Sequence, residues 1–149
     1  MSKITGAILN VVETGRLYSM KETCAQTGLA YETLKFYCNS GLVPNVKRDA
    51  NNRRVFNDRD IAWIRSLVCL KNCDMTIAEM KTYLAFCLHG QTSIPERKVM
   101  LRKKRDLLLK KQAEIQAAIE YIDLKEEFYD DVLSGKTPYR SNLLPTDDH

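Results

Sequence analysis

Residues 93–134 constrain the fold of this chain more than any other part of its sequence. Apolar or aromatic residues recur along this stretch at intervals of seven, which is the repeat of a coiled coil. They are Ile94, Leu101, Leu108, Ile115, Ile122 and Tyr129, and Met100, Leu107, Tyr121 and Phe128 widen the stripe. Pro95 stands in the first turn, where a helix tolerates it, and no strong helix breaker follows until Gly135. The pattern therefore predicts one helix of about 40 residues, far longer than a typical globular helix.

An apolar stripe of this length has to be buried against a partner helix. The rest of the sequence predicts only short helices, so we expect the partner to be the same helix of a second copy. Basic residues crowd the first half of the stretch: Arg97, Lys98, Arg102, Lys103, Lys104, Arg105, Lys110 and Lys111. Acidic residues follow in the second half, namely Glu114, Glu120, Glu126 and Glu127. Opposite charges face each other when the helices run antiparallel, so the charges favour an antiparallel coiled coil.

We interpret the basic run as the solvated face of this coiled coil rather than as a nucleic-acid stripe, because it surrounds the apolar seam. The sequence leaves open a kink between Ala118 and Glu127.

Helix start and stop signals are denser in residues 17–90. Ser19 and Glu22 have the spacing of a capping box, which predicts a helix over about residues 20–27. A second short helix is expected over about residues 30–40, after a tight turn that contains glycine. Two short helices joined in this way are typical of a helix-turn-helix.

A β-hairpin is expected next, over residues 46–56. Its centre, Asp49-Ala50-Asn51-Asn52, is rich in turn formers, and Val46 can pair with Val55-Phe56 across it. The hairpin carries four basic residues: Lys47, Arg48, Arg53 and Arg54. A hairpin that directly follows a helix-turn-helix is a wing.

Two more helices are predicted, from Asn57 or Asp58 to about Lys71 and over residues 77–88. The expected fold is mainly α: a winged helix-turn-helix, then a long dimerisation helix. In sequence terms the chain divides into four parts. They are an N-terminal extension (1–16), a winged helix-turn-helix DNA-binding domain (17–90), a coiled-coil dimerisation helix (93–134) and a flexible tail (135–149).

Composition narrows the class of protein. The net charge of +4 and the pI near 8.8 permit a polyanionic partner. No apolar run is long enough to span a membrane, and residues 1–16 lack the features of a signal peptide, so we expect a cytoplasmic protein without a membrane partner.

The five cysteines are irregularly spaced and form no C-x-x-C pair: Cys24, Cys38, Cys69, Cys73 and Cys87. We expect no disulfide framework, no metal site and no cofactor. An enzyme that used a thiol would need a base beside it, and His89 is the one histidine before the tail. We therefore predict no enzymatic activity. A coiled-coil interaction protein without a DNA role is a further alternative, which the wing arginines disfavour.

The second predicted helix has the pattern of a recognition helix, with a polar outer face and an apolar inner face. Tyr31, Glu32, Lys35 and Asn39 are expected outward, and Leu34 and Tyr37 toward the core or its boundary. The basic wing residues are well placed for phosphates or a minor groove.

Several short motifs, in this order, resemble the MerR family of transcription regulators. They are residues 18–22 (YSMKE), 28–29 (GL), 33–37 (TLKFY), 41–44 (GLVP), 48–49 (RD) and 51–56 (NNRRVF). The resemblance implies a homodimer on double-stranded promoter DNA with a long spacer. It also implies activation by twisting that DNA, with RNA polymerase as an indirect partner.

The resemblance implies that Lys35, Tyr37, Arg48 and Arg54 contact DNA. Together with neighbouring polar residues, the candidate DNA-binding set is Tyr18, Tyr31, Thr33, Lys35, Tyr37, Lys47, Arg48, Arg53 and Arg54. The sequence departs from the usual pattern, since Lys35 replaces an Arg, Phe36 a Tyr and Arg53 a Tyr, while Asn52 stands where Gly is common. Without the guanidinium fork, Lys35 is expected to meet a phosphate rather than a base.

Residues 60–64 (DIAWI) and 92–97 (TSIPER) resemble the AdhR/NmlR-like branch, whose members respond to aldehydes or other electrophiles. In that branch a cysteine on the third helix is the sensor, and Cys69 matches its position. Arg65, one turn earlier, could lower the pKa of that thiol. Two alternatives remain open: a small-molecule effector without cysteine chemistry, and a metal effector. Metal-responding relatives carry a cysteine pair after the long helix, and no cysteine follows Cys87.

Overall fold

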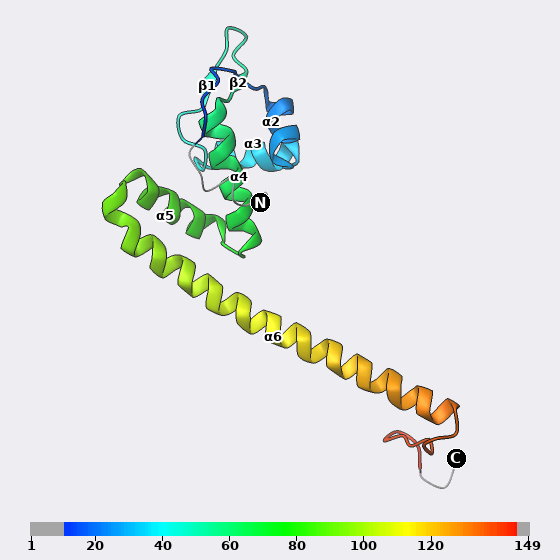
Figure 1. Ribbon diagram of the computed structural model, residues 1–149. Coiled ribbons are helices and arrows are strands. Elements are labelled where there is room, and N and C mark those ends of the chain that lie inside the picture. Colours follow the sequence, from blue (N-terminus) through cyan, green and yellow to red (C-terminus); the bar gives the residue numbers. More distant parts are fainter. Residues whose placement is uncertain (1–10, 146–149) are drawn as a thin grey trace. The chain divides into compact units, whose positions relative to one another are not determined.

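The computed structural model describes residues 11–145 of the chain (Figure 1). Its elements are α2 (Met20–Thr27), α3 (Tyr31–Asn39), β1 (Lys47–Arg48), β2 (Arg54–Val55), α4 (Asp58–Asn72), α5 (Ile77–Leu88), the 3-10 turn η1 (Gln91–Ser93) and α6 (Ile94–Leu133). The expected fold class is confirmed: a helix-turn-helix, a two-stranded antiparallel hairpin and a long helix. The chain forms two compact units, Met1–Arg105 and Asp106–His149, which we describe separately as the N-terminal unit and the distal unit.

Three helices of the N-terminal unit begin at complete capping boxes. Ser19 caps α2 with Glu22 as its reciprocal partner, and Asn57 does the same for α4 with Asp60. Thr76 and Glu79 form the third box, at the start of α5. In each box a side chain satisfies a backbone N–H that the helix itself leaves unpaired. The sequence signals for these helix starts are confirmed.

The N-terminal unit has one apolar core beneath the helix-turn-helix. Leu34 from α3, Phe56 after the hairpin, and Ile64 and Leu67 from α4 are all fully buried. The other buried members of this cluster are Tyr37, Leu42, Val43, Ile61, Leu70, Met75 and Met80. The core holds α2, α3 and α4 together, and so fixes the recognition helix relative to the hairpin that follows it.

The ladder of the hairpin is shorter than expected, although its register is one that would place Val46 opposite Phe56. Lys47 lies opposite Val55, and Arg48 lies opposite Arg54. Phe56 does not pair with Val46: its backbone forms an isolated antiparallel bridge to Tyr18 instead, with N–O distances of 2.7 and 2.9 Å. The ladder ends at Lys47 and Val55 because the N–H and C=O of Phe56 both bond to Tyr18, while the Phe56 ring is fully buried in the core.

The segment just before residue 17 makes a contact that the sequence did not predict. Thr14 donates two hydrogen bonds to Asp58 at the start of α4, from its backbone N and its Oγ1 (both 2.7 Å). These bonds attach the end of the expected N-terminal extension to α4. The first ten residues of the expected extension lie outside the described part of the chain.

The long helix α6 comprises 40 residues and is uninterrupted across Ala118–Glu127. It begins at Ile94, directly after the 3-10 turn η1. The Ser93 hydroxyl is buried and donates to the backbone carbonyls of Phe86 and Gly90, so it closes the turn from α5 into α6. Among residues 11–145 no helix is long and apolar enough to cross a membrane.

Candidate nucleic-acid interface

A groove of about 720 Å³ lies between the start of α2, the start of α3 and the hairpin. Among the side chains that line it are Lys21 and Glu22 of α2, Tyr31 of α3, and Arg48, Arg53 and Arg54 of the hairpin. Figure 1 shows that the hairpin loop projects past these helices on the same side of the N-terminal unit. The structure thus brings together in one concave surface cationic residues that are up to 33 positions apart in the sequence, from Lys21 to Arg54.

The recognition helix presents most of its predicted face to solvent. Tyr31 is 52% exposed, and Lys35 and Asn39 are exposed as well. Thr33 is half-buried. Tyr37 is only 2% exposed and belongs to the core, so the structure places it beneath the recognition face and not on it. Its burial agrees with the expected position at the core or its boundary, and its assignment to the DNA-binding set stays a prediction.

The basic residues of the hairpin differ in how firmly they are held. Arg54 is half-buried and donates from Nη2 to Oδ1 of Asn39, which ties the hairpin to the end of α3. Arg48 donates from Nη1 to the Asn52 carbonyl (2.9 Å), within the hairpin itself. Lys47 and Arg53 are exposed. A rigid wing with outward cations is suited to the phosphate backbone of a duplex.

Asp49 and Asn52 shape the turn between the two strands. One carboxylate oxygen of Asp49 accepts the backbone N–H groups of Asn51 and Arg53, each at 2.9 Å. Asn52 has a φ of 59°, a left-handed conformation that Asn tolerates better than most residues. The turn therefore accommodates Asn52 at a position where glycine is common in the family.

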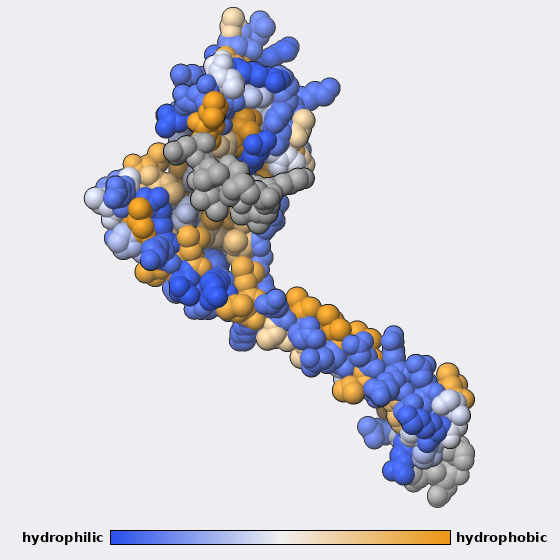
Figure 2. Space-filling model, viewed as in Figure 1, coloured by the Kyte–Doolittle hydropathy of each residue, from blue (hydrophilic) through white to orange (hydrophobic). Residues whose placement is uncertain are grey.

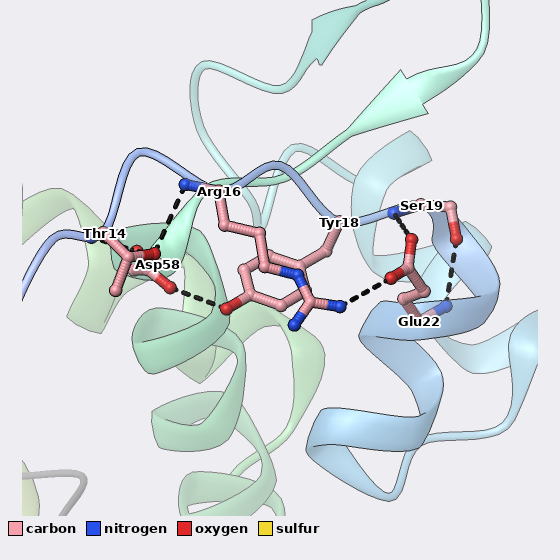
Figure 3. A network of polar contacts seen from close by, with 6 residues as sticks. All are labelled: Thr14, Arg16, Tyr18, Ser19, Glu22 and Asp58. Atoms are coloured by element: carbon pink, nitrogen blue, oxygen red, sulfur yellow. Dashed lines mark hydrogen bonds and ion pairs between the residues drawn. The ribbon is translucent and has the colours of Figure 1, made fainter.

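Tyr18 has an unexpected environment for a predicted DNA contact (Figure 3). Its hydroxyl donates to Oδ1 of Asp58 (2.8 Å), and the Arg16 guanidinium carbon lies 4.6 Å from its ring centroid. The hydrogen bond to Asp58, followed by burial, raises the pKa of Tyr18. Its hydroxyl is therefore occupied within the protein, and its ring supports a neighbouring cation.

The sequence analysis did not predict the ion pair between Arg16 and Glu22. Nη2 of Arg16 lies 2.8 Å from Oε2 of Glu22, and Oε1 of Glu22 accepts the Ser19 backbone N–H at 3.2 Å. These contacts, led by the Ser19 backbone and then Arg16, lower the pKa of Glu22. The sequence signal for this ion pair is an arginine shortly before a capping box. That pattern is too common to predict a contact by itself.

The predicted sensor residue, Cys69, is half-buried on α4. The guanidinium of Arg65, one turn earlier on α4, donates to the backbone carbonyl and the side-chain oxygen of Gln26 at the end of α2, at 3.0–3.2 Å. Burial raises the pKa of three other thiols, those of Cys24, Cys38 and Cys87. Within residues 11–145 no cluster of three or more potential metal ligands occurs.

The fold and this basic groove define a winged helix-turn-helix DNA-binding protein. Residues 18–87 match the MerR HTH family regulatory protein profile. An uncharacterized HTH-type transcriptional regulator of Haemophilus influenzae is 30% identical over 112 residues, which cover 75% of this chain and 83% of the relative. AdhR of Bacillus subtilis, an HTH-type transcriptional regulator, is 31% identical over 91 residues, or 61% of this chain and 65% of AdhR.

Among solved structures, the chain resembles HiNmlR, a MerR family regulator lacking the sensor domain, in its complex with promoter DNA. The TM-score is 0.71 at 28% identity, over 80% of this chain and 90% of HiNmlR. The chain therefore belongs to the MerR family of HTH transcriptional regulators, in its AdhR/NmlR-like branch. It is a DNA-binding regulator and not an enzyme.

Proposed function

We propose that this regulator binds promoter DNA as a homodimer and activates transcription by distorting the promoter spacer. The groove between α2, α3 and the hairpin carries the proposal, because it gathers Lys21, Arg48, Arg53 and Arg54 around the recognition helix. We place Tyr31 and Lys35 of α3 and Lys47 of the wing on the same DNA-facing surface, since their side chains are exposed beside it. A promoter-binding protein works in the compartment that holds the genome, and we propose the cytoplasm.

The test of this interface is a salt titration of DNA binding. Arg53→Ala removes one exposed cation from the groove, so it is expected to weaken binding to all duplexes and to lower the slope of log K against log salt by about one. Arg54→Ala is expected to cost more than Arg53→Ala, because Arg54 also anchors the hairpin to Asn39. Arg59→Ala is the matched control: Arg59 is exposed and pairs with Glu13 rather than with groove residues. An Arg53→Ala variant with unchanged affinity and slope would remove the groove from the interface.

The homodimer is proposed to form through α6, as an antiparallel coiled coil. None of the 40 residues of α6 is buried, although many are apolar. Exposed examples are Leu101, Leu107, Ile115, Ile119, Ile122 and Tyr129, and Figure 2 shows apolar patches beside charged ones along this helix. An apolar helix face of this extent is stable in water only when a partner covers it. The basic first half and acidic second half favour the antiparallel orientation.

The proposed signal is an aldehyde or another electrophile that reacts with Cys69. Its half-buried position on α4 leaves the thiol within reach of a small molecule while its neighbours Leu67 and Leu70 are core residues. Addition to an aldehyde forms an S–C bond, breaks the carbonyl π bond and moves the thiol proton to oxygen. The added volume would strain a helix whose other face is packed.

A reporter strain that carries Cys69→Ser tests this sensor. We expect it to lose induction by formaldehyde and to keep its affinity for DNA, whereas Cys73→Ser, one turn later on α4, should behave as the parent protein. Full induction of Cys69→Ser would show that the effector acts elsewhere.

A small-molecule effector without cysteine chemistry is the second candidate, and one observation favours it. A pocket of about 620 Å³ lies between the hairpin base and α5, with Trp63, Leu84 and Leu88 as apolar lining and Asp60 as a polar group. Burial raises the pKa of Asp60, as expected in a partly desolvated site. Under this alternative, Cys69→Ser keeps its induction, and Leu84→Trp, which fills the pocket, loses it.

A further inference from the structure

We propose that Arg16, from the segment before the helix-turn-helix, is a further DNA-contacting residue that bridges Glu22 to a phosphate of the duplex. The inference rests on the proposed function, since it takes the groove between α2, α3 and the hairpin as the DNA-facing surface. It adds a contact from a residue outside the stretch that matches the MerR family profile, residues 18–87.

Glu22 creates an electrostatic difficulty in this groove. It lines the groove together with Arg48, Arg53 and Arg54, and its side chain is 47% exposed. Its carboxylate is needed locally, because it completes the capping box of α2 through the Ser19 N–H. A carboxylate that faces a phosphate backbone repels it, and the repulsion is strongest at low salt. The groove therefore needs a compensating cation beside Glu22.

Arg16 supplies that cation. Its Nη2 lies 2.8 Å from Oε2 of Glu22, and its side chain is 56% exposed. A guanidinium has five N–H donors in a planar fork. The bond to Glu22 uses one edge of the fork, so the other donors can reach a phosphate oxygen while the ion pair persists. Arginine is suited to such bridging between two anions, because its charge is delocalised and permanent.

The position of Arg16 is set by a chain of contacts that starts on α4 (Figure 3). Oδ2 of Asp58 accepts both hydrogen bonds of Thr14, and Oδ1 accepts the hydroxyl of Tyr18. Residues on both sides of Arg16 are thereby anchored. The Tyr18 ring, held further by its backbone bridge to Phe56, then supports the guanidinium at 4.6 Å. Tyr18 is accordingly a positioning residue for Arg16.

The alternative is that Arg16 only stabilises the start of α2. A merely structural arginine lowers DNA affinity, if at all, without changing how many counterions the complex releases. A phosphate contact changes the salt dependence directly, because each neutralised phosphate contributes about 0.9 to the slope of log K against log salt. The slope therefore separates the two roles.

The experiment measures binding of the full-length protein to a 30-base-pair duplex by fluorescence anisotropy, over a series of salt concentrations. Arg16→Ala is expected to weaken binding by roughly three- to tenfold at low salt and to lower the slope by about 0.9. Arg16→Lys keeps the charge but not the fork, so it should keep most of the slope. The double variant Arg16→Ala/Glu22→Gln also removes the carboxylate that repels the phosphates. It should therefore bind more tightly than Arg16→Ala, while its slope stays lower than that of the parent protein.

Two controls keep the result interpretable. Arg59→Ala removes an exposed arginine that pairs with Glu13 and should bind within twofold of the parent. Thermal melting of every variant identifies any that fails to fold. If Arg16→Ala is among them, Arg16→Gln, which keeps a long polar side chain but loses the charge, takes its place, with a slope lowered by about 0.9 as support and an unchanged slope as refutation.

The inference is overturned if Arg16→Ala binds with an unchanged slope, whatever its affinity. If Arg53→Ala lowers the slope in the same experiment, the groove still faces DNA and only the role of Arg16 fails. If neither variant lowers it, the groove itself is not the DNA-facing surface.

Discussion

The N-terminal unit and the described part of the distal unit use apolar residues in opposite ways. In the N-terminal unit, Leu34, Phe56, Ile64 and Leu67 are completely buried by the unit itself. In the distal unit, from Asp106 to residue 145, no described residue is buried. The first region therefore buries its apolar residues within the single chain, whereas the second leaves them exposed, as the proposed dimer requires. If the proposed dimer forms, stability is intramolecular in the first region and depends on protein concentration in the second.

The largest effect is expected from truncating the core of the N-terminal unit. Phe56→Ala removes a fully buried ring and is expected to lower the free energy of unfolding by about 3–5 kcal/mol. Phe36→Ala is the matched control, since Phe36 on α3 is 51% exposed and should cost less than about 1 kcal/mol. Urea denaturation followed by circular dichroism measures both. Equal losses would mean that burial in the single chain does not decide stability here.

A substitution on the apolar face of α6 in the distal unit should change the dimer dissociation constant rather than the folding of the single chain. Ile115→Asp places a charge on the apolar seam and is expected to raise the dimer dissociation constant at least about 100-fold, since an unpaired buried charge costs about 3 kcal/mol or more. Ala113→Asp puts the same charge on the opposite face of the helix and should leave the dimer intact. Sedimentation equilibrium gives both constants. A dimer that survives Ile115→Asp would contradict the proposed seam.

A smaller effect, of opposite sign, is expected at Thr23. It is completely buried in α2, and its Oγ1 has no hydrogen-bond partner in the part of the chain that the structure describes. Thr23→Val replaces the hydroxyl by a methyl group of similar size and should raise the free energy of unfolding by about 1 kcal/mol. Thr27→Val is the control, because the Thr27 hydroxyl donates to the Thr23 carbonyl (2.8 Å) and its loss should not stabilise. A destabilised Thr23→Val would indicate a contact that the hydroxyl makes through water.

The smallest effect is a pH dependence at the surface of the N-terminal unit. Hydrogen bonds from the Thr14 backbone, then the Thr14 and Tyr18 hydroxyls, lower the pKa of Asp58 below its ordinary value of 3.8. A lowered folded-state pKa means that the stabilisation is fully present above the unfolded-state value and is lost as pH falls through the folded-state value. Asp58→Asn should therefore lower the melting temperature near neutral pH, and the difference from the parent should shrink as the pH falls below 3.8 and through the lowered folded-state pKa of Asp58. Parallel melting curves across this range would exclude a contribution from the Asp58 carboxylate.

Local signals in the sequence were sufficient for most of the fold. The capping boxes at Ser19 and Thr76 mark helix starts, and the helix that follows Thr76 has the predicted bounds, Ile77–Leu88. Gly28, with a φ of 77°, ends α2 as expected. Such signals are readable because the donor and acceptor lie within a few residues of each other. The seven-residue repeat likewise predicted the single long helix α6.

The candidate site was predicted less completely. The cations of the wing were recognised because they cluster within the hairpin, residues 46–56. The bridge between Tyr18 and Phe56 and the hydrogen bonds between Thr14 and Asp58 were not predicted. Each depends on which residues meet across 38 or more positions, and no local pattern encodes that.

The sequence by itself therefore determined the elements, their order and the class of DNA-binding fold, since capping, turn chemistry and apolar periodicity act over short distances along the chain. Only the tertiary structure decided which polar side chains share a surface. It joined Asp58 on α4 to Thr14 and Tyr18, and so placed Arg16 beside Glu22 at the edge of the basic groove. The physical reason is that the common core packs α2 and α4 side by side, and this packing sets distances between residues that the sequence separates by 40 positions or more.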